Sequence, residues 1–227
     1  MIEEILQPAY IEYLTTARTD RPGKSKAPLV RKPALWKEFG ATYCGKTLDY
    51  WPRRVFVSSD HHFGHKNIIK FSERPFADLT EMIRRHNSVV NIDDVCIFVG
   101  DFAFLPDKEA NKVLWRMNGH KVQIIGNHDI HKNRKLKELI FDEIYLCAHM
   151  VVDGGDLLFT HYPVHNETID WVVNVHGHEH VAHQATNTPR HINVNCELHD
   201  YYPIPIEQIV NAAKERSNNG WPWTVKS

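Results

Sequence analysis

The chain has 227 residues, of which 42% are hydrophobic and 24% are charged, and its formal net charge is −1. This length and composition suffice for one sizeable core and argue against wholesale disorder. The near-neutral net charge does not indicate bulk electrostatic binding of nucleic acid, but it does not exclude a local basic patch. Sixteen histidines are an excess, and because histidine is a common metal ligand, their positions matter.

Cysteine usage and the N-terminal sequence bear on the compartment. The four cysteines form no CxxC pair, which favours a reducing compartment over a disulfide framework. The segment MIEEILQPAYIEYL is acidic and lacks the basic-then-apolar order of a signal peptide. No apolar run approaches the roughly 20 residues that a membrane helix requires. We therefore expect a cytoplasmic protein without membrane contact, and the sequence predicts no oligomeric state.

Residues 1–50 differ in composition from the rest of the chain. Between residues 18 and 37, seven basic residues stand against one acidic residue, and prolines and a glycine interrupt the segment. We expect an irregular N-terminal extension over residues 1–50, followed by one domain over residues 51–227. The extension either packs on the domain surface or contacts a phosphate-rich substrate.

From residue 51 onward, short apolar strands first alternate with amphipathic helices and then follow one another. The strands are expected at residues 54–58, 95–99, 122–125, 144–152, 156–160, 171–175 and 192–196. The helices are expected at residues 79–90, 107–118 and 133–141. Gly154 and Gly155 predict a hairpin between two of the strands. This order predicts an α/β (α+β) fold in which two mixed sheets pack together with helices outside.

Five of the predicted strands end in residues that commonly bind metals. The segments are Asp60-His61-His62, Gly100-Asp101, Gly126-Asn127-His128-Asp129, Thr160-His161 and His176-Gly177-His178-Glu179-His180. The carboxyl ends of sheet strands are where α/β folds place their sites. So many polar side chains would be costly to bury there unless they converge on cations.

The order DxH, GD, GNHD, H and GHxH resembles the metallophosphoesterase (calcineurin-like phosphoesterase) superfamily, over roughly residues 51–206. The stretch SSDHHFGHKNII, with the following ERPF, resembles a small bacterial and phage branch of it. The resemblance implies a four-layer α/β/β/α sandwich of two mixed sheets flanked by helices. It also implies hydrolysis of phosphomonoesters or phosphodiesters, nucleotide-like ones in particular.

The resemblance further implies two divalent metal ions. One ion would be held by Asp60, His62 and His180, the other by Asn127, His161 and His178, with Asp101 bridging the two. Imidazole, carboxylate and amide donors suit Mn²⁺ first, with Fe, Zn²⁺, Ni²⁺ and Co²⁺ left open. Asp101 and His128 are the expected catalytic residues: a metal-bridging hydroxide attacks in line and His128 protonates the departing oxygen. The second acid of related phosphatases is missing after Gly100-Asp101, where Phe102-Ala103-Phe104 follows, so His128 has no assigned orienting partner.

Other residues near the motifs allow two interpretations. His65, Arg74 and His165 are candidate substrate contacts, and each is also compatible with an ordinary loop role. His61 should point away from the ligands if its segment is extended. His176 is expected in the core or behind a ligand, and Asp129 is expected to shape its loop.

Two rival functions use the same motifs. One is a nuclease that binds nucleic acid through the basic N-terminal arm, and the other is a non-catalytic module that binds a partner. Because one metal chemistry serves all phosphate esters, the motifs do not choose the substrate.

Overall fold

The computed structural model describes residues 45–48, 50, 53–75, 79–133, 135–152, 155–165, 172–180, 186 and 188–216. The basic part of the predicted N-terminal extension lies outside these residues, as does Gly154 of the predicted hairpin. Among the helices described, none is long and apolar enough to cross a membrane.

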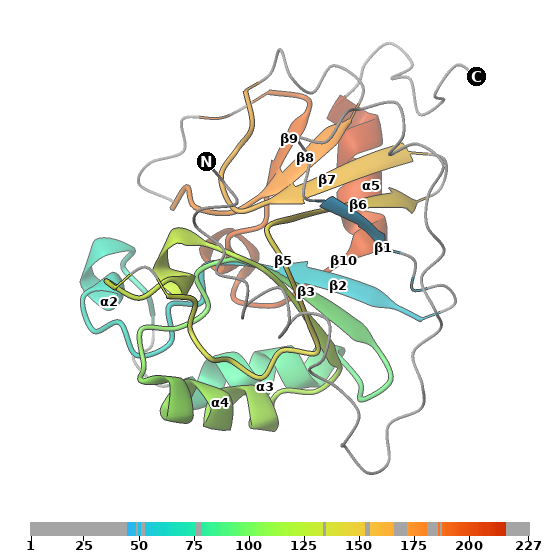
Figure 1. The fold of residues 1–227 in the computed structure, drawn as a ribbon. Coiled ribbons are helices and arrows are strands. Elements are labelled where there is room, and N and C mark those ends of the chain that lie inside the picture. The colour runs from blue at the N-terminus through green and yellow to red at the C-terminus, as the bar shows by residue number, and fades with distance from the viewer. Residues whose placement is uncertain are drawn as a thin grey trace.

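The described chain builds two five-stranded mixed sheets (Figure 1). The first sheet has the order β10 (Ile204–Pro205), β2 (Val55–Ser58), β3 (Val95–Val99), β4 (His120–Ile124) and β5 (Glu143–Tyr145). The second has the order β1 (Gly45–Leu48), β6 (Cys147–Val152), β7 (Gly155–Thr160), β8 (Val173–His176) and β9 (His191–Asn193). Strands β2 to β5 are parallel, as are β7 to β9, so within each set the carboxyl ends share one edge.

Alternating side chains divide the apolar interior into two cores. Val55 and Val57 of β2 face the space between the sheets, where they join Leu157 and Phe159 of β7. Phe56 points the other way, into a core shared with helices α3 (Leu79–Val89) and α4 (Asp107–Arg116). Both helices cover the outer face of the first sheet (Figure 1). The period-two pattern of the strands therefore fixes which face of each sheet is covered.

The predicted α/β class with two mixed sheets and helices is confirmed, but four layers are not all seen. The buried residues of the C-terminal helix α5 (Ile206–Arg216) belong to the core between the sheets. On the outer face of the second sheet, the described residues supply a small cluster of Leu158, Val172 and Val164. The described part of the chain thus shows helices outside one sheet only.

The predicted helix at residues 133–141 is wrong where the chain is described, because residues 135–141 contain no helix. Side chains of α4 accept hydrogen bonds from backbone N–H groups that would otherwise bond within a helix. The Glu138 N–H donates to Asp107 Oδ2 at 2.9 Å, and the Ile140 N–H donates to Asn111 Oδ1 at 2.8 Å. The segment is therefore held as an extended strap against α4.

Two predicted boundaries also shift. The strand predicted at residues 144–152 is two strands, and β5 and β6 lie in different sheets. The domain begins before residue 51, because β1 pairs in parallel with β6 and Leu48 is buried. The hairpin pairing of β6 with β7 is confirmed.

Candidate metal centre

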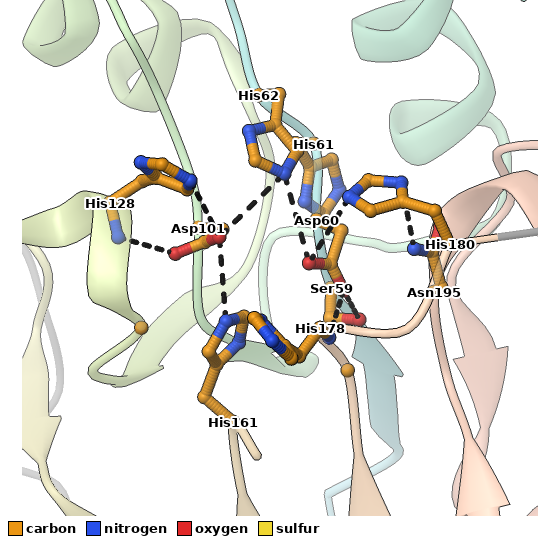
Figure 2. Close-up of polar contacts among 12 residues, drawn as sticks. Ser59, Asp60, His61, His62, Asp101, His128, His161, His178, His180 and Asn195 are labelled. Carbon is orange, nitrogen blue, oxygen red and sulfur yellow. Dashed lines mark hydrogen bonds and ion pairs between the residues drawn. The ribbon is translucent and has the colours of Figure 1, made fainter. Parts of the chain in front are cut away.

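The polar segments after five strands meet at one place (Figure 2). Asp60 and His62 follow β2, and Asp101 follows β3. His128 lies in the 3₁₀ turn η3 (Asn127–Asp129) after β4. His161 follows β7, and His178 and His180 follow β8. The expected convergence at the carboxyl ends of the strands is what the structure shows.

The converging side chains form two groups that could each hold a metal ion. The first group is Asp60, His62 and His180, and the second is Asp101, His161 and His178. Within each group, one ligand atom per residue lies within 4.8 Å of the others. Donors about 2.0–2.2 Å from one cation would stand roughly 3–4 Å apart, so this spacing fits a cation in each group.

The first group contains buried polar atoms without hydrogen bonds. Asp60 Oδ1 and His62 Nε2 are both buried and have no hydrogen-bond partner in the described structure. These atoms lie 3.8 Å apart, and His180 Nε2 lies 4.0 Å from the same carboxylate oxygen. Buried polar atoms are rarely left unpaired, because an unmade hydrogen bond costs free energy. A cation between the three atoms would remove that cost, so these residues fit a metal.

Asp101 stands between the two groups. Its Oδ2 atom lies 3.4 Å from His161 Nε2 in the second group and 3.7 Å from His62 Nε2 in the first. Asn127 Oδ1 lies 3.0 Å from His161 Nε2, which places Asn127 beside the second group. All seven predicted ligands therefore lie at this site, and coordination of a metal by any of them remains a prediction.

Both carboxylates are held in the ionised form that a cation requires. Burial would raise the pKa of Asp60, but the neighbouring His62 and the charge of His161 lower it to about 2. The pKa of Asp101 is lowered as well: burial opposes the change, and His161 causes it. The same pairing raises the pKa of His161 to about 9, against the effect of burial. The site therefore gathers negative charge where a cation would sit.

The backbone is strained where the ligands are. Asp60, His62, Asp101 and His178 have positive φ angles of 56°, 50°, 54° and 68°. Left-handed backbone is unfavourable for residues with a Cβ, and such strain concentrates at functional sites. Backbone hydrogen bonds hold the strained segments together, since Asp60 N–H donates to Gly100 O and His62 N–H donates to Asp101 O.

Asp129 joins two of the ligand loops, as its predicted loop role requires. It is fully buried, and its carboxylate accepts from the N–H groups of Asp101, Phe102 and Gly126 at 2.9–3.0 Å. Burial, together with the charge of Asp101, raises the pKa of Asp129. This carboxylate thereby sets the position of Asp101 relative to the turn that carries His128.

His128 has an aromatic neighbour in place of the missing acid. Its Nε2 atom lies 4.0 Å from Asp101 Oδ2, and its ring packs against Phe104 at 4.6 Å between centroids. Phe104 in turn stacks on His65, with ring centroids 4.1 Å apart and planes 11° apart. Burial lowers the pKa of His128, and the charge of Asp101 opposes this. Phe104 therefore contacts both His65 and the predicted proton donor, and contact of His65 with substrate remains a prediction.

The position of Arg74 contradicts its interpretation as a substrate contact. Its guanidinium is buried, and its N–H groups donate to Glu197 and to the carbonyls of Asp60 and His61. It is therefore turned into the protein beneath the first group. His165 is exposed, and its contact with substrate remains a prediction.

Two further histidines lie as expected. His61 is buried against Phe63, Phe98 and Phe102, and burial lowers its pKa to about 3. His176 is fully buried, and its Nδ1 lies 2.9 Å from the Gly177 carbonyl oxygen. Both are core histidines behind the ligand segments.

Comparison with known proteins places the chain among relatives without stated activity. No protein-family model matches it. The uncharacterized protein MJ1445 of Methanocaldococcus jannaschii is 33% identical over 172 residues, which cover 70% of this chain and 90% of that protein. The crystal structure of AQ665, a protein of unknown function from Aquifex aeolicus, has a TM-score of 0.56 and 27% identity. That likeness covers 70% of this chain and 98% of the Aquifex chain.

Proposed function

The chain belongs to the same family as the Methanocaldococcus jannaschii protein MJ1445, and we propose that this chain is a dinuclear metal-dependent phosphoesterase. The proposal includes a metallophosphoesterase-like sandwich as its fold. One observation carries it: two adjacent groups of metal-binding side chains face a shared carboxylate, Asp101. Such pairing is the arrangement that two-metal phosphate chemistry uses.

The donor set narrows the choice of cation. Both groups combine one carboxylate with two imidazoles, and neither contains a thiolate. This mixture suits Mn²⁺ first and also accepts Fe, Zn²⁺, Ni²⁺ or Co²⁺. When bound, a pair of such ions supplies Lewis acidity to a water molecule and to the phosphate oxygens.

The chain's own residues position the proposed proton donor. Asp129 keeps the Asp101 loop against the His128 turn, so the two side chains act at a fixed separation. His128 is partly exposed and its Nε2 lies 4.0 Å from Asp101 Oδ2, where its ring can carry a proton to the departing ester oxygen. The Phe104 ring limits the orientations that His128 can adopt.

The test is hydrolysis by purified full-length protein, stripped with chelator and reloaded with Mn²⁺, Zn²⁺ or Ni²⁺. We expect metal-dependent cleavage of an aryl phosphate or a bis-aryl phosphodiester. Asp101→Ala and His128→Ala should each lower the rate at least about 100-fold. His131→Ala is the matched control, because that histidine pairs with Asp107 outside both groups. A folded, metal-loaded protein that cleaves no generic ester would contradict the proposal.

The substrate class is the open part of this proposal. A panel of mononucleotides, cyclic nucleotides, dinucleotides and oligonucleotides would decide between monoesters and diesters. The nuclease alternative depends on the basic N-terminal arm, and no observation on the described residues favours it. Preferential cleavage of oligonucleotides that disappears on removal of residues 1–44 would support that alternative.

A further inference from the structure

A buried ion pair lies directly behind the first metal group. Arg74 Nε and Nη2 both donate to Glu197 Oε1, at 3.1 and 2.9 Å. The two side chains are only 4% and 1% exposed, although the residues stand 123 positions apart in the chain. Burying two charges costs desolvation energy, so such a pair is by itself weak support for stability. What the pair holds in place is therefore the informative feature.

Arg74 fixes the backbone that carries two ligands. Its Nη2 donates to the Asp60 carbonyl at 2.8 Å, and its Nη1 donates to the His61 carbonyl at 2.6 Å. These carbonyls belong to the two peptide units that link Asp60 with His62, and both of those residues have left-handed backbone. The planar, forked guanidinium can hold the two carbonyls together in a way that a lysine cannot.

Glu197 fixes the third ligand of the same group. Its second oxygen, Oε2, lies 3.0 Å from His180 Nδ1. It is the nearest polar atom to that nitrogen: Asn195 Nδ2 and Ser72 Oγ lie at 3.3 and 3.5 Å. An ionised carboxylate only accepts, so the hydrogen of the neutral ring lies on Nδ1. The Nε2 lone pair is then free toward Asp60, as metal binding requires.

The second group has a separate support. His161 Nδ1 lies 2.9 Å from the Val99 carbonyl, and the Asp101 N–H donates to Asp129. Neither contact involves Arg74 or Glu197. The two groups therefore share the region around Asp101 but rest on different supporting residues.

We propose that Arg74 and Glu197 are positioning residues that hold all three ligands of the first metal group, and only that group, through one buried ion pair. This inference rests on the proposed function, because it assumes that both groups bind cations. Its consequence is selective: damage to the ion pair weakens one metal position and spares the other. The same pair accounts for the buried, inward orientation of Arg74.

The experiment is a calorimetric titration of metal-free protein with Mn²⁺, with bound metal counted by elemental analysis and by the spin coupling of the manganese signal. The wild type should bind two ions per chain, and they should be coupled. In Glu197→Gln we expect one ion at unchanged affinity, the other weakened about 10–100-fold, and the coupled signal lost at stoichiometric metal. Excess Mn²⁺ should restore the coupled signal.

A matched control separates positioning from general loss of stability. Asp156 pairs with His149 at 2.6 Å and is buried in the second sheet, as Glu197 pairs with His180. Asp156→Asn should lower the unfolding temperature and keep both ions. The double variant Arg74→Met/Glu197→Gln removes both buried charges and should regain stability while one metal position stays weak. If Glu197→Gln fails to fold, Arg74→Lys should likewise weaken one metal position and spare the other.

The outcomes distinguish this inference from the proposed function. A wild type that binds no Mn²⁺ overturns both. A wild type with two ions, and a folded Glu197→Gln variant that also binds two at wild-type affinity, overturns the inference alone. The inference alone is also overturned by a folded Glu197→Gln variant that loses both ions equally, or by a double variant that regains metal affinity together with stability.

Discussion

Gly177→Ala is the substitution whose effect follows most directly from the geometry. A Cβ atom at Gly177 would lie 2.4 Å from Asp60 Oδ2 and 2.5 Å from Ser59 Oγ. Ordinary van der Waals contact begins at 3.4 Å, so the backbone and Asp60 must separate by 3.4 − 2.4 = 1.0 Å. Overpacking of this kind costs about 1–3 kcal/mol of unfolding free energy. A displacement of about 1 Å at a catalytic group also costs roughly 100-fold in rate.

The control for this prediction is Gly119→Ala. Gly119 has a φ of +87° and precedes β4, at the end of the strand opposite the ligands. Left-handed backbone costs a residue with a Cβ about 1–2 kcal/mol, so both variants should lose similar stability in urea unfolding of the metal-free proteins. Only Gly177→Ala should also lose Mn²⁺ affinity and aryl phosphate hydrolysis. Wild-type metal binding and rate in Gly177→Ala would refute this account of the close approach.

Three further predictions use the buried and aromatic groups. Burial lowers the pKa of His86 to about 4, so between pH 6.5 and about 4 the unfolded chain binds a proton that the folded chain excludes. As the pH falls through this range, His86 should lower the unfolding free energy by about 1.4 kcal/mol per pH unit. In urea titrations, His86→Phe should flatten this pH dependence, and an unchanged slope would contradict the prediction. Asp101 raises the pKa of His161 to about 9, and a metal ion binds only the neutral ring. Mn²⁺ affinity, measured by calorimetry, should therefore increase from pH 7 to pH 9. A flat profile would count against coordination by His161. Phe104→Ala should lower turnover about 10-fold with both ions retained, because His128 loses its packing partner. An unchanged rate would show that Phe104 does not position His128.

The parts of the fold that follow from local pattern could be predicted. The run at residues 95–99 is uniformly apolar, and β3 (Val95–Val99) is buried along its whole length. Because parallel strands end at one edge of a sheet, the polar residues after β2, β3 and β4 could be expected to meet. Asp60 and Asp101 then follow from their positions in the sequence.

The remaining features depend on contacts between distant segments. The sequence at residues 133–141 suits a helix, yet Asp107 and Asn111 of α4 take its backbone hydrogen bonds. No local pattern marks Glu197, because its role depends on Arg74 and His180, which lie 123 and 17 positions away. Such partners are set only when the sheets pack together.

The same limit applies to backbone geometry. The left-handed conformations at His62 and His178 have no signature in the sequence, since only a few per cent of non-glycine residues adopt them. They arise from hydrogen bonds across the site, such as the one from the His178 N–H to Asp60 Oδ2 at 3.0 Å. Sequence reasoning could therefore name the candidate ligands but not the strained loops that position them.

Anomalous diffraction from crystals grown with Mn²⁺ would test the two-metal centre most directly. Two anomalous peaks per chain, about 3.5–4 Å apart on either side of the Asp101 carboxylate, are the expected result. One peak should contact Asp60, His62 and His180, and the other His161 and His178. Crystals at saturating Mn²⁺ in which these side chains keep their positions and no peak lies among them would contradict the account.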